Sequence, residues 1–309
     1  GVGAAGDAGR RFEENHRLFP ADGVATVSMS RCVVVVLTFN AAPIIAETIA
    51  QARKVSPQVY VVDSGSTDGT LALLQQLGCE VVHRPFANYS DQRNWAITQV
   101  QQRAEWQLHL DADEVLDETA VAEIQAVLAA DAPAPAAWML RRRDYFMGRM
   151  LRFSGLNPWH LRLFRSGAGQ CEDRLYDQHF VASGSPGRLR GWMHDKNAVS
   201  LADWTARHNR WSDLEAVEIA QTNQATASGV VLRSRLLGDA RERTRFLKGA
   251  YYKLPGGVRA LAYFLYRYIF RLGFLDGAAG FYFAFFQALW FRLLVDAKLD
   301  ERQQQPRQG

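Results

Sequence analysis

The sequence predicts an α/β protein with a mostly parallel central sheet flanked by helices, plus further helices at the carboxyl end. Two observations lead to this prediction. Short runs of β-branched and apolar residues alternate with segments of helical periodicity. Polar clusters directly follow three of these runs, at residues 38–40, 63–68 and 111–113. Because ligands bind beyond the carboxyl ends of parallel strands, we expect a ligand site at that edge.

The elements follow one another in a regular order. CVVVVL at residues 32–37 predicts the first central strand, and the apolar pattern after Pro43 predicts a helix, because proline is tolerated in a first helical turn. Further strands are expected at residues 59–62, 80–83, 106–110, 138–143 and 160–165, and further helices at 70–77, 89–102 and 117–130. A break rich in proline at 131–135 separates two halves of the sheet.

The length and composition indicate one main domain with an appendage. The chain has 309 residues, of which 48% are hydrophobic. We expect a catalytic domain at residues 31–250, with a first half at 31–116 and a second half at 135–215. Residues 1–30 begin with Gly and Ala repeats and are expected to form a flexible tail. They lack the apolar run of a signal peptide, so nothing in them indicates export. The three cysteines lie far apart and predict neither a disulfide framework nor a zinc site, which fits a reducing, cytosolic setting.

The carboxyl-terminal segment at residues 251–309 differs in character. Residues 278–295 are apolar over almost the width of a bilayer, but Gln287 and Arg292 interrupt them. We therefore expect amphipathic helices that lie in a membrane interface, with arginines at anionic headgroups. A spanning helix and a hairpin packed on the catalytic domain or on a second subunit are the alternatives. The arginines expected at the headgroups are Arg259, Arg267 and Arg271.

Asp111 and Asp113 directly follow the predicted strand at residues 106–110. Two carboxylates at this spacing can reach one hard cation, whose other positions are filled by phosphate oxygens and water. Carboxylates at the tip of a buried strand are costly without a compensating cation. The pattern therefore predicts a site for Mg²⁺ or Mn²⁺, although surface turns produce the same DxD string.

Four segments resemble the successive motifs of the family 2 glycosyltransferases. They are VVVVLTFN, VYVVDSGSTDGT, SDQRNWA and LHLDADE, and they cover residues 32–116 in the order of the family. Within the family the chain looks most like the bacterial group that contains lipopolysaccharide-core β-1,4-glucosyltransferases. The resemblance implies the GT-A fold and inverting transfer of a hexose, glucose from UDP-glucose, to a lipid-linked saccharide of lipopolysaccharide or another cell-surface polysaccharide. It also implies a place at the cytoplasmic face of the bacterial inner membrane.

The resemblance implies a role for individual residues of the first half. Thr38 and Asp63 would contact the nucleoside, with Asn40 beside them in the donor site, and Arg93 would contact the nucleotide end of the donor. Asp111 would contact the donor diphosphate as well as the metal. For Asp63 the residues alone also allow a turn or helix-capping role, and for Arg93 a place on a helix surface.

The second half is expected to supply a base, because inverting transfer needs the acceptor hydroxyl to be deprotonated. The candidates are Glu172, Asp173 and Asp177. Their distance from residues 210–211 favours Asp173, whereas the position of the preceding LFR strand favours Asp177, which is our first choice.

RHNRW at residues 207–211 looks like the Gln-x-x-Arg-Trp motif of membrane-associated members of the family, with Arg207 in place of the glutamine. Arg210 would then pair with the diphosphate, and Trp211 would form a wall of the acceptor site. A surface arginine beside a core tryptophan is the alternative.

Other functions share parts of this pattern. A sugar-phosphate nucleotidyltransferase should carry a phosphate loop rich in glycine and arginine after the first strand, which LTFNAAP lacks. A membrane-associated scaffold without catalysis has no need of the intact acidic and basic site residues. Ten Lys or Arg at residues 233–271 indicate an anionic partner, but the neighbouring aromatic runs favour lipid or core contacts over nucleic acid. The carboxyl-terminal helices are also a candidate surface for a homo-oligomer.

Overall fold

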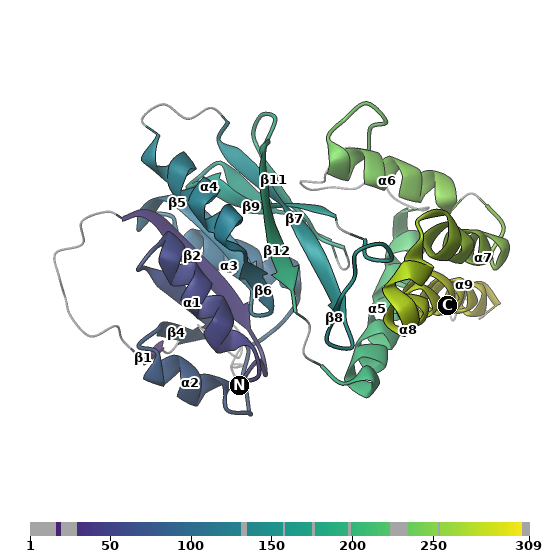
Figure 1. Ribbon diagram of the computed structural model, residues 1–309, viewed down its shortest axis with the longest axis horizontal. Coiled ribbons are helices and arrows are strands. Elements are labelled where there is room, and N and C mark those ends of the chain that lie inside the picture. The colour runs from purple at the N-terminus through teal and green to yellow at the C-terminus, as the bar shows by residue number, and fades with distance from the viewer. Residues whose placement is uncertain are drawn as a thin grey trace, which may run out of the picture.

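The computed structural model describes residues 17–19, 30–130, 135–156, 158–174, 177–196, 199–222, 234–252 and 254–304. A central sheet flanked by helices fills one side of the molecule, and a group of helices fills the other (Figure 1). The strands are β1 (Arg17–Phe19), β2 (Ser30–Thr38), β3 (Val59–Asp63), β4 (Glu80–His83), β5 (Ala104–Asp111), β6 (Glu114–Leu116), β7 (Ala137–Phe146), β8 (Arg149–Met150), β9 (Trp159–Arg165), β10 (Gly169–Cys171), β11 (Phe180–Ala182) and β12 (Gly187–Asp195).

The main sheet has the strand order β1-β4-β3-β2-β5-β9-β7-β12-β6. Strands β4, β3, β2 and β5 run parallel, as do β7 and β12, whereas β9 runs antiparallel to both of its neighbours. The connection from β7 to β9 carries β8, which pairs back on β7 as a hairpin, in place of a helical crossover, and β9 returns antiparallel. The predicted α/β class is thus confirmed. Residues 17–19, expected in a tail, pair with β4, and residues 1–16 and 20–29 of that tail lie outside the described residues.

Helices cover both faces of the parallel half. The helices α1 (Ile45–Val55), α2 (Thr70–Gln76) and α4 (Glu118–Ala129) pack on one face, and α3 (Tyr89–Val100) packs on the other. Alternate residues of β2 pack into the two cores. Val34 and Val36 face the core under α1, α2 and α4, and Val33 and Val35 face the core under α3. The continuous apolar run of β2 is therefore buried on both sides, as its sequence predicts.

The second half of the chain ends in a helical group next to the β7–β8 hairpin, at the end of the sheet away from β4 (Figure 1). A cluster of buried apolar side chains, including Phe146, Trp204 and Phe283, joins this group to the sheet. The elements are α5 (Leu201–Thr222), α6 (Ala240–Tyr251), α7 (Val258–Leu265), the π-helical turn η1 (Tyr266–Phe270), η2 (Gly273–Asp276), α8 (Gly277–Ala284), η3 (Phe285–Trp290) and α9 (Phe291–Gln304).

Two of the arginines expected at lipid headgroups turn inward instead. Arg267 is 1% exposed and donates a hydrogen bond to the carbonyl of Ser154. Arg259 is buried as well and forms an ion pair with Asp296 of α9. The expectation was wrong for this pair because buried carbonyl and carboxylate oxygens between the helices need donors, and these guanidinium groups supply them.

Residues Gly273–Gln304 form one helix that is long and apolar enough to cross a membrane, judged by length and composition. Its most apolar window has a mean hydropathy of 1.5, and 39% of that window is buried inside the molecule. Part of the segment thus packs on the rest of the chain, through α9 against α5.

Candidate active site

A pocket of about 1920 Å³ opens at the carboxyl ends of β2 and β5. Small-molecule sites commonly measure about 300–1,000 Å³, so this pocket has room for more than one substrate. Three of the residues singled out in the sequence, Asp63, Glu172 and Asp173, do not line it. The structure brings the others to its wall: Thr38, Asn40, Arg93, Asp111, Asp113, Asp177, Arg210 and Trp211.

Asp111, at the end of β5, is held by two arginines from different elements. Arg93 of α3 donates from Nη2 to both carboxylate oxygens, at 3.1 and 3.0 Å. Arg162 of β9 is 3% exposed, donates to Oδ2 of Asp111 at 3.1 Å, and also pairs with Glu114. Burial alone would raise the pKa of Asp111, but the two arginines outweigh it and hold that pKa below its usual range. Asp111 is therefore ionised and fixed in orientation.

Asp113 lies beside this cluster in a different electrostatic state. Burial, followed by the charges of Asp111 and Glu114, raises its pKa to about 6. Glu114 is buried too, and its pKa is raised to about 7, by burial first. Within the described part of the chain, no basic side chain lies within ion-pair distance of the Asp113 carboxylate. The cluster thus carries an excess of negative charge that a bound cation would relieve.

The donor set fits a hard divalent cation. Asp111 and Asp113 offer oxygen ligands, which Mg²⁺ and Mn²⁺ accept, and Mg²⁺ usually keeps several positions for water and phosphate oxygens. Among the described residues, no group of three or more His, Cys, Asp or Glu side chains is arranged to hold a metal ion. Phosphate oxygens of a diphosphate would supply further ligands to such a cation.

The loop after β3 is held by residues that were candidates for nucleotide contact. Asp63 is fully buried, and its carboxylate accepts backbone N–H groups from Gly65 at 2.8 Å and Ser66 at 3.0 Å. Asn40 accepts the N–H of residue 67 through Oδ1 at 2.8 Å. Both side chains are thus engaged in shaping this loop. Thr38 is different, because its buried hydroxyl has no hydrogen-bond partner in the described structure and lies at the pocket.

The three candidate bases occupy three different environments in the loop between β10 and β11. Glu172 is fully buried and bonded to Arg245 and to the N–H of His179 at 2.9 Å. Asp173 is exposed and lies outside the pocket wall. Asp177 lines the pocket, and its Oδ2 lies 3.2 Å from Nζ of Lys248. Of the three, Asp177 alone presents a carboxylate to the pocket.

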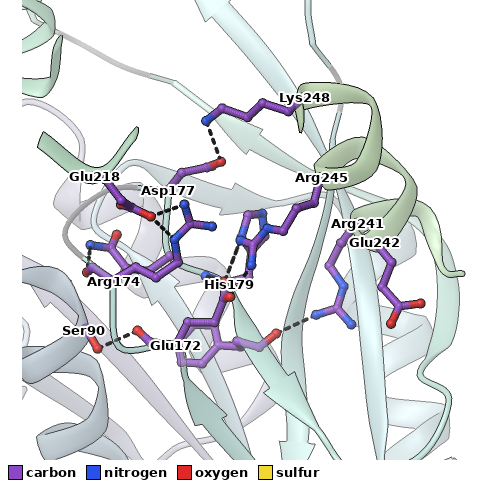
Figure 2. A network of polar contacts seen from close by, with 12 residues as sticks. Ser90, Glu172, Arg174, Asp177, His179, Glu218, Arg241, Glu242, Arg245 and Lys248 are labelled. Carbon is purple, nitrogen blue, oxygen red and sulfur yellow. Dashed lines mark hydrogen bonds and ion pairs between the residues drawn. The ribbon is translucent and has the colours of Figure 1, made fainter. Parts of the chain in front are cut away.

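Helix α6 holds this loop from above (Figure 2). Arg245 and Lys248 point from one side of the helix toward Glu172 and Asp177, and Arg241 donates to the carbonyl of Phe180 at 2.5 Å. Burial would raise the pKa of Asp177, but Lys248 and then His179 outweigh it and hold that pKa below its usual range. Part of the anionic partner expected for the basic segment is therefore the protein's own acidic loop.

Several residues of the site were not predicted from the sequence. Glu114 and Arg162 form the buried pair beside Asp111, and Asp195 faces the same cluster with a pKa raised to about 7, by burial first. An arginine in the middle of the apolar strand HLRLFR was the available signal, since a charge in a buried strand needs a partner. The spacing of Arg241, Arg245 and Lys248 on one helix face was a second signal.

Arg210 and Trp211 reach the pocket from α5. Arg210 is exposed. Trp211 stacks with the guanidinium of Arg207, whose Cζ lies 5.0 Å from the ring centroid. Trp211 and His208 are arranged edge to face, with their ring centroids 4.8 Å apart. The motif therefore supplies one charged and one aromatic wall of the pocket.

Comparison with known proteins gives a family match and several relatives. Residues 33–181 match the family described as "Glycosyl transferase family 2". The chain is 30% identical over 172 residues to "Lipopolysaccharide core biosynthesis glycosyltransferase LpsC" of Rhizobium meliloti, which covers 52% of this chain and 61% of that protein. It is 35% identical over 101 residues to an uncharacterized glycosyltransferase of Rickettsia felis, 33% of this chain and 35% of that one. The chain thus spans less than two thirds of each of these curated relatives.

Two solved structures are similar over most of the chain. One is the mannosyltransferase PcManGT from Pyrobaculum calidifontis in complex with GDP-Man and Mn²⁺, with a TM-score of 0.46, 14% identity and coverage of 92% of this chain and 91% of that one. The other is S. aureus TarS 1-349 in complex with UDP-GlcNAc, with a TM-score of 0.39, 15% identity and coverage of 90% and 93%. The fold assignment stands on the strand order and helix placement described above.

Proposed function

Because the chain belongs to glycosyl transferase family 2, we propose that it transfers a hexose with inversion from a nucleotide sugar to a lipid-linked saccharide. One observation supports this most strongly. The acidic pair Asp111 and Asp113 lies at the end of a central strand, in a pocket large enough for a donor and an acceptor. The proposed donor is UDP-glucose, and the proposed product belongs to lipopolysaccharide or another cell-surface polysaccharide, in keeping with the likeness to LpsC.

In this proposal Asp111 and Asp113 hold Mg²⁺ or Mn²⁺, which would neutralise the leaving diphosphate. Arg93 and Arg162 keep the Asp111 carboxylate ionised and in place. The hydroxyl of Thr38, which has no hydrogen-bond partner among the described residues, is available to the nucleoside. Asn40 and Asp63 shape the neighbouring loop and support the nucleoside site through it. Arg210 pairs with the diphosphate, and Trp211 walls the acceptor side.

Asp177 is the proposed base. The ion pair with Lys248 keeps its carboxylate ionised, so it can accept the proton of the acceptor hydroxyl. The carboxylate of Glu172 is engaged by Arg245 and His179, so its proposed role is to stabilise the loop between β10 and β11. Asp173 is exposed outside the pocket wall and is the less suitable of the two aspartates.

A screen of nucleotide sugars tests this function directly. Purified protein is incubated with UDP-glucose, UDP-GlcNAc or GDP-mannose and with Mn²⁺, Mg²⁺ or EDTA, and released nucleoside diphosphate is measured. We expect release from UDP-glucose that depends on the divalent cation. The proposal fails if no nucleotide sugar is hydrolysed or bound with any cation.

We also propose that the helical group docks on an anionic membrane, at the cytoplasmic face of the bacterial inner membrane. Support comes from large apolar side chains that remain exposed on neighbouring turns, with Phe270 at 77%. Contiguous exposed apolar area of this kind marks sites of membrane or protein contact. This apolar surface comprises Val258, Leu261, Tyr266, Ile269, Phe270, Leu272, Phe274 and Leu275.

Phe270→Glu should release the protein from vesicles of phosphatidylglycerol and phosphatidylcholine in a flotation assay. The carboxylate would have to enter the acyl boundary, so we expect the bound fraction to fall about tenfold. Leu201→Glu, at an exposed leucine that begins α5, is the matched control and should keep binding. Unchanged flotation of the Phe270 variant would refute membrane docking through this surface. A loss of dimers in sedimentation instead would assign the surface to a homo-oligomer.

A further inference from the structure

Arginine and tryptophan side chains alternate across β9, β7 and β12. The strand register pairs Arg141 with Trp159 on one side and with Trp192 on the other, so the three side chains share one face of the sheet. The guanidinium carbon of Arg141 lies 4.5 Å from the Trp192 ring centroid, and that of Arg143 lies 3.8 Å from it. We call this group the arginine–tryptophan patch, and its members are Arg141, Arg143, Arg188, Arg271, Trp159 and Trp192.

The patch arginines differ from neighbouring arginines in their ion pairs. Within the described ranges, none of the four has an acidic side chain at ion-pair distance, and Nε of Arg141 is buried without a hydrogen-bond partner. Arginines that neighbour the patch in sequence are paired: Arg142 contacts Asp144 at 2.9 Å, and Arg190 contacts Glu123 at 2.9 Å. Within the described ranges, the lack of an acidic partner thus distinguishes the patch arginines from these two neighbours.

The charges also repel one another. Burial, followed by the charges of Arg143 and Arg271, lowers the pKa of Arg141. Side chains that repel at close range are unfavourable unless an anion is present to join them. The tryptophan rings hold the guanidinium planes by cation–π contacts and leave N–H groups free for a phosphate or carboxylate. The patch therefore has the side chains of an anion-binding site.

The location of the patch indicates what the anion belongs to. Trp159 and Arg271 also line the large pocket. Arg271 directly follows η1, where Phe270 projects from the apolar surface. The patch therefore lies between the pocket proposed for sugar transfer and the surface proposed for lipid.

We propose that the arginine–tryptophan patch binds phosphate groups of the acceptor and so holds the acceptor at the pocket, separately from the carboxylates that serve the donor. This inference rests on the proposed function for the identity of the acceptor. The phosphate can belong to a phosphorylated saccharide or to a lipid headgroup, because both present the same oxyanion to the guanidinium groups.

Two probes distinguish these sources, both used with EDTA and without donor. Fructose 1,6-bisphosphate, with fructose as its neutral control, reports on sugar phosphates in isothermal titration. Phosphatidylglycerol vesicles, with phosphatidylcholine vesicles as their control, report on lipid headgroups in flotation. The double variant Arg141→Gln/Arg143→Gln should weaken binding of at least one probe by about tenfold or more. The affected probe identifies the source of the phosphate.

The control is Arg190→Gln, which lies on β12 like Arg188 but is already paired with Glu123. It should bind the probes as tightly as the wild-type chain does. The affinity of Arg143→Lys should lie between those of the wild-type chain and the double variant, since lysine keeps the charge and loses the planar fork. Circular dichroism confirms that each variant folds. Equal binding by the double variant and the Arg190 control, or no binding of either probe by the wild-type chain, overturns the proposal.

Failure of this inference can be told apart from failure of the proposed function. Hydrolysis of the donor by water needs no acceptor, so the double variant should release nucleoside diphosphate within about twofold of the wild-type rate. A wild-type chain that hydrolyses no donor counts against sugar transfer alone. A wild-type chain that hydrolyses donor and binds neither phosphate probe counts against the patch alone.

Discussion

Asp113→Ala is expected to abolish metal-dependent turnover, with kcat falling by about 10³-fold or more, in line with the loss of a principal electrostatic stabiliser. Asp113 lines the pocket and has no ion-pair partner among the described residues, so a cation is the group its charge would serve. The measurement is release of nucleoside diphosphate from the donor identified in the screen, with Mn²⁺ at saturation.

The same substitution should leave folding intact. The raised pKa of Asp113, about 6, means that its charged form is disfavoured in the metal-free protein. Removal of that carboxylate should therefore leave the Tm unchanged or raise it at pH 8. Asp91→Ala controls for the loss of a negative charge near the site, because it removes a carboxylate of α3 that is paired with Arg84. Full turnover by the Asp113 variant would contradict the assignment.

Protons should compete with the metal. Because the folded-state pKa of Asp113 is raised, the carboxyl is protonated in the metal-free protein below about pH 6 and must lose that proton to bind a cation. We expect the apparent affinity for Mn²⁺ to fall as the pH drops from 8 to 5. This affinity is measured by titration with Mn²⁺ at each pH, followed by electron paramagnetic resonance. An affinity independent of pH would exclude Asp113 as a ligand.

Asp177→Asn has the second large expected effect. Loss of a general base commonly costs about 10² to 10⁴ in rate, so we expect kcat for transfer to fall in that range while the donor KM stays within about twofold. The measurement is transfer of radiolabelled sugar from the donor to glycolipid extracted from bacterial envelopes. The donor KM should hold because Asp177 comes from the acceptor-side loop and α6 stabilises that loop independently through Glu172.

Two neighbouring variants give this prediction its controls. Asp173→Asn removes an exposed carboxylate outside the pocket wall and should keep transfer within about twofold. Glu172→Gln should lower the Tm instead, because it weakens the ion pair between the fully buried Glu172 and Arg245. Loss of transfer in the Asp173 variant, with full transfer in the Asp177 variant, would reverse the assignment of the base.

The parallel half of the sheet was predictable because its information is local. Runs such as VVVV in β2 mark burial on both faces, and the acidic pair follows β5 at once, so both the strand and its site can be found in one window of sequence. The short strands β6, β10 and β11 have three residues each and carry too little pattern to be found in that way.

The remaining features depend on partners that are distant in sequence. Arg162 and Glu114 are 48 residues apart, and Arg245 and Glu172 are 73 apart. A basic residue on an amphipathic helix has the same local pattern whether its anion is a lipid headgroup or a buried carboxylate. For Arg259 and Arg267 the partners lie inside the protein, and periodicity carries no information about that choice.

Anomalous diffraction at the manganese edge, from crystals soaked with Mn²⁺ and UDP, tests the central claim most directly. The account predicts a single strong peak within ligand distance of Asp111 and Asp113, with diphosphate oxygens on its other side, and no such peak for the Asp113→Ala variant. Density for UDP in the pocket with no manganese between these two carboxylates, or a manganese peak bound elsewhere, would contradict it.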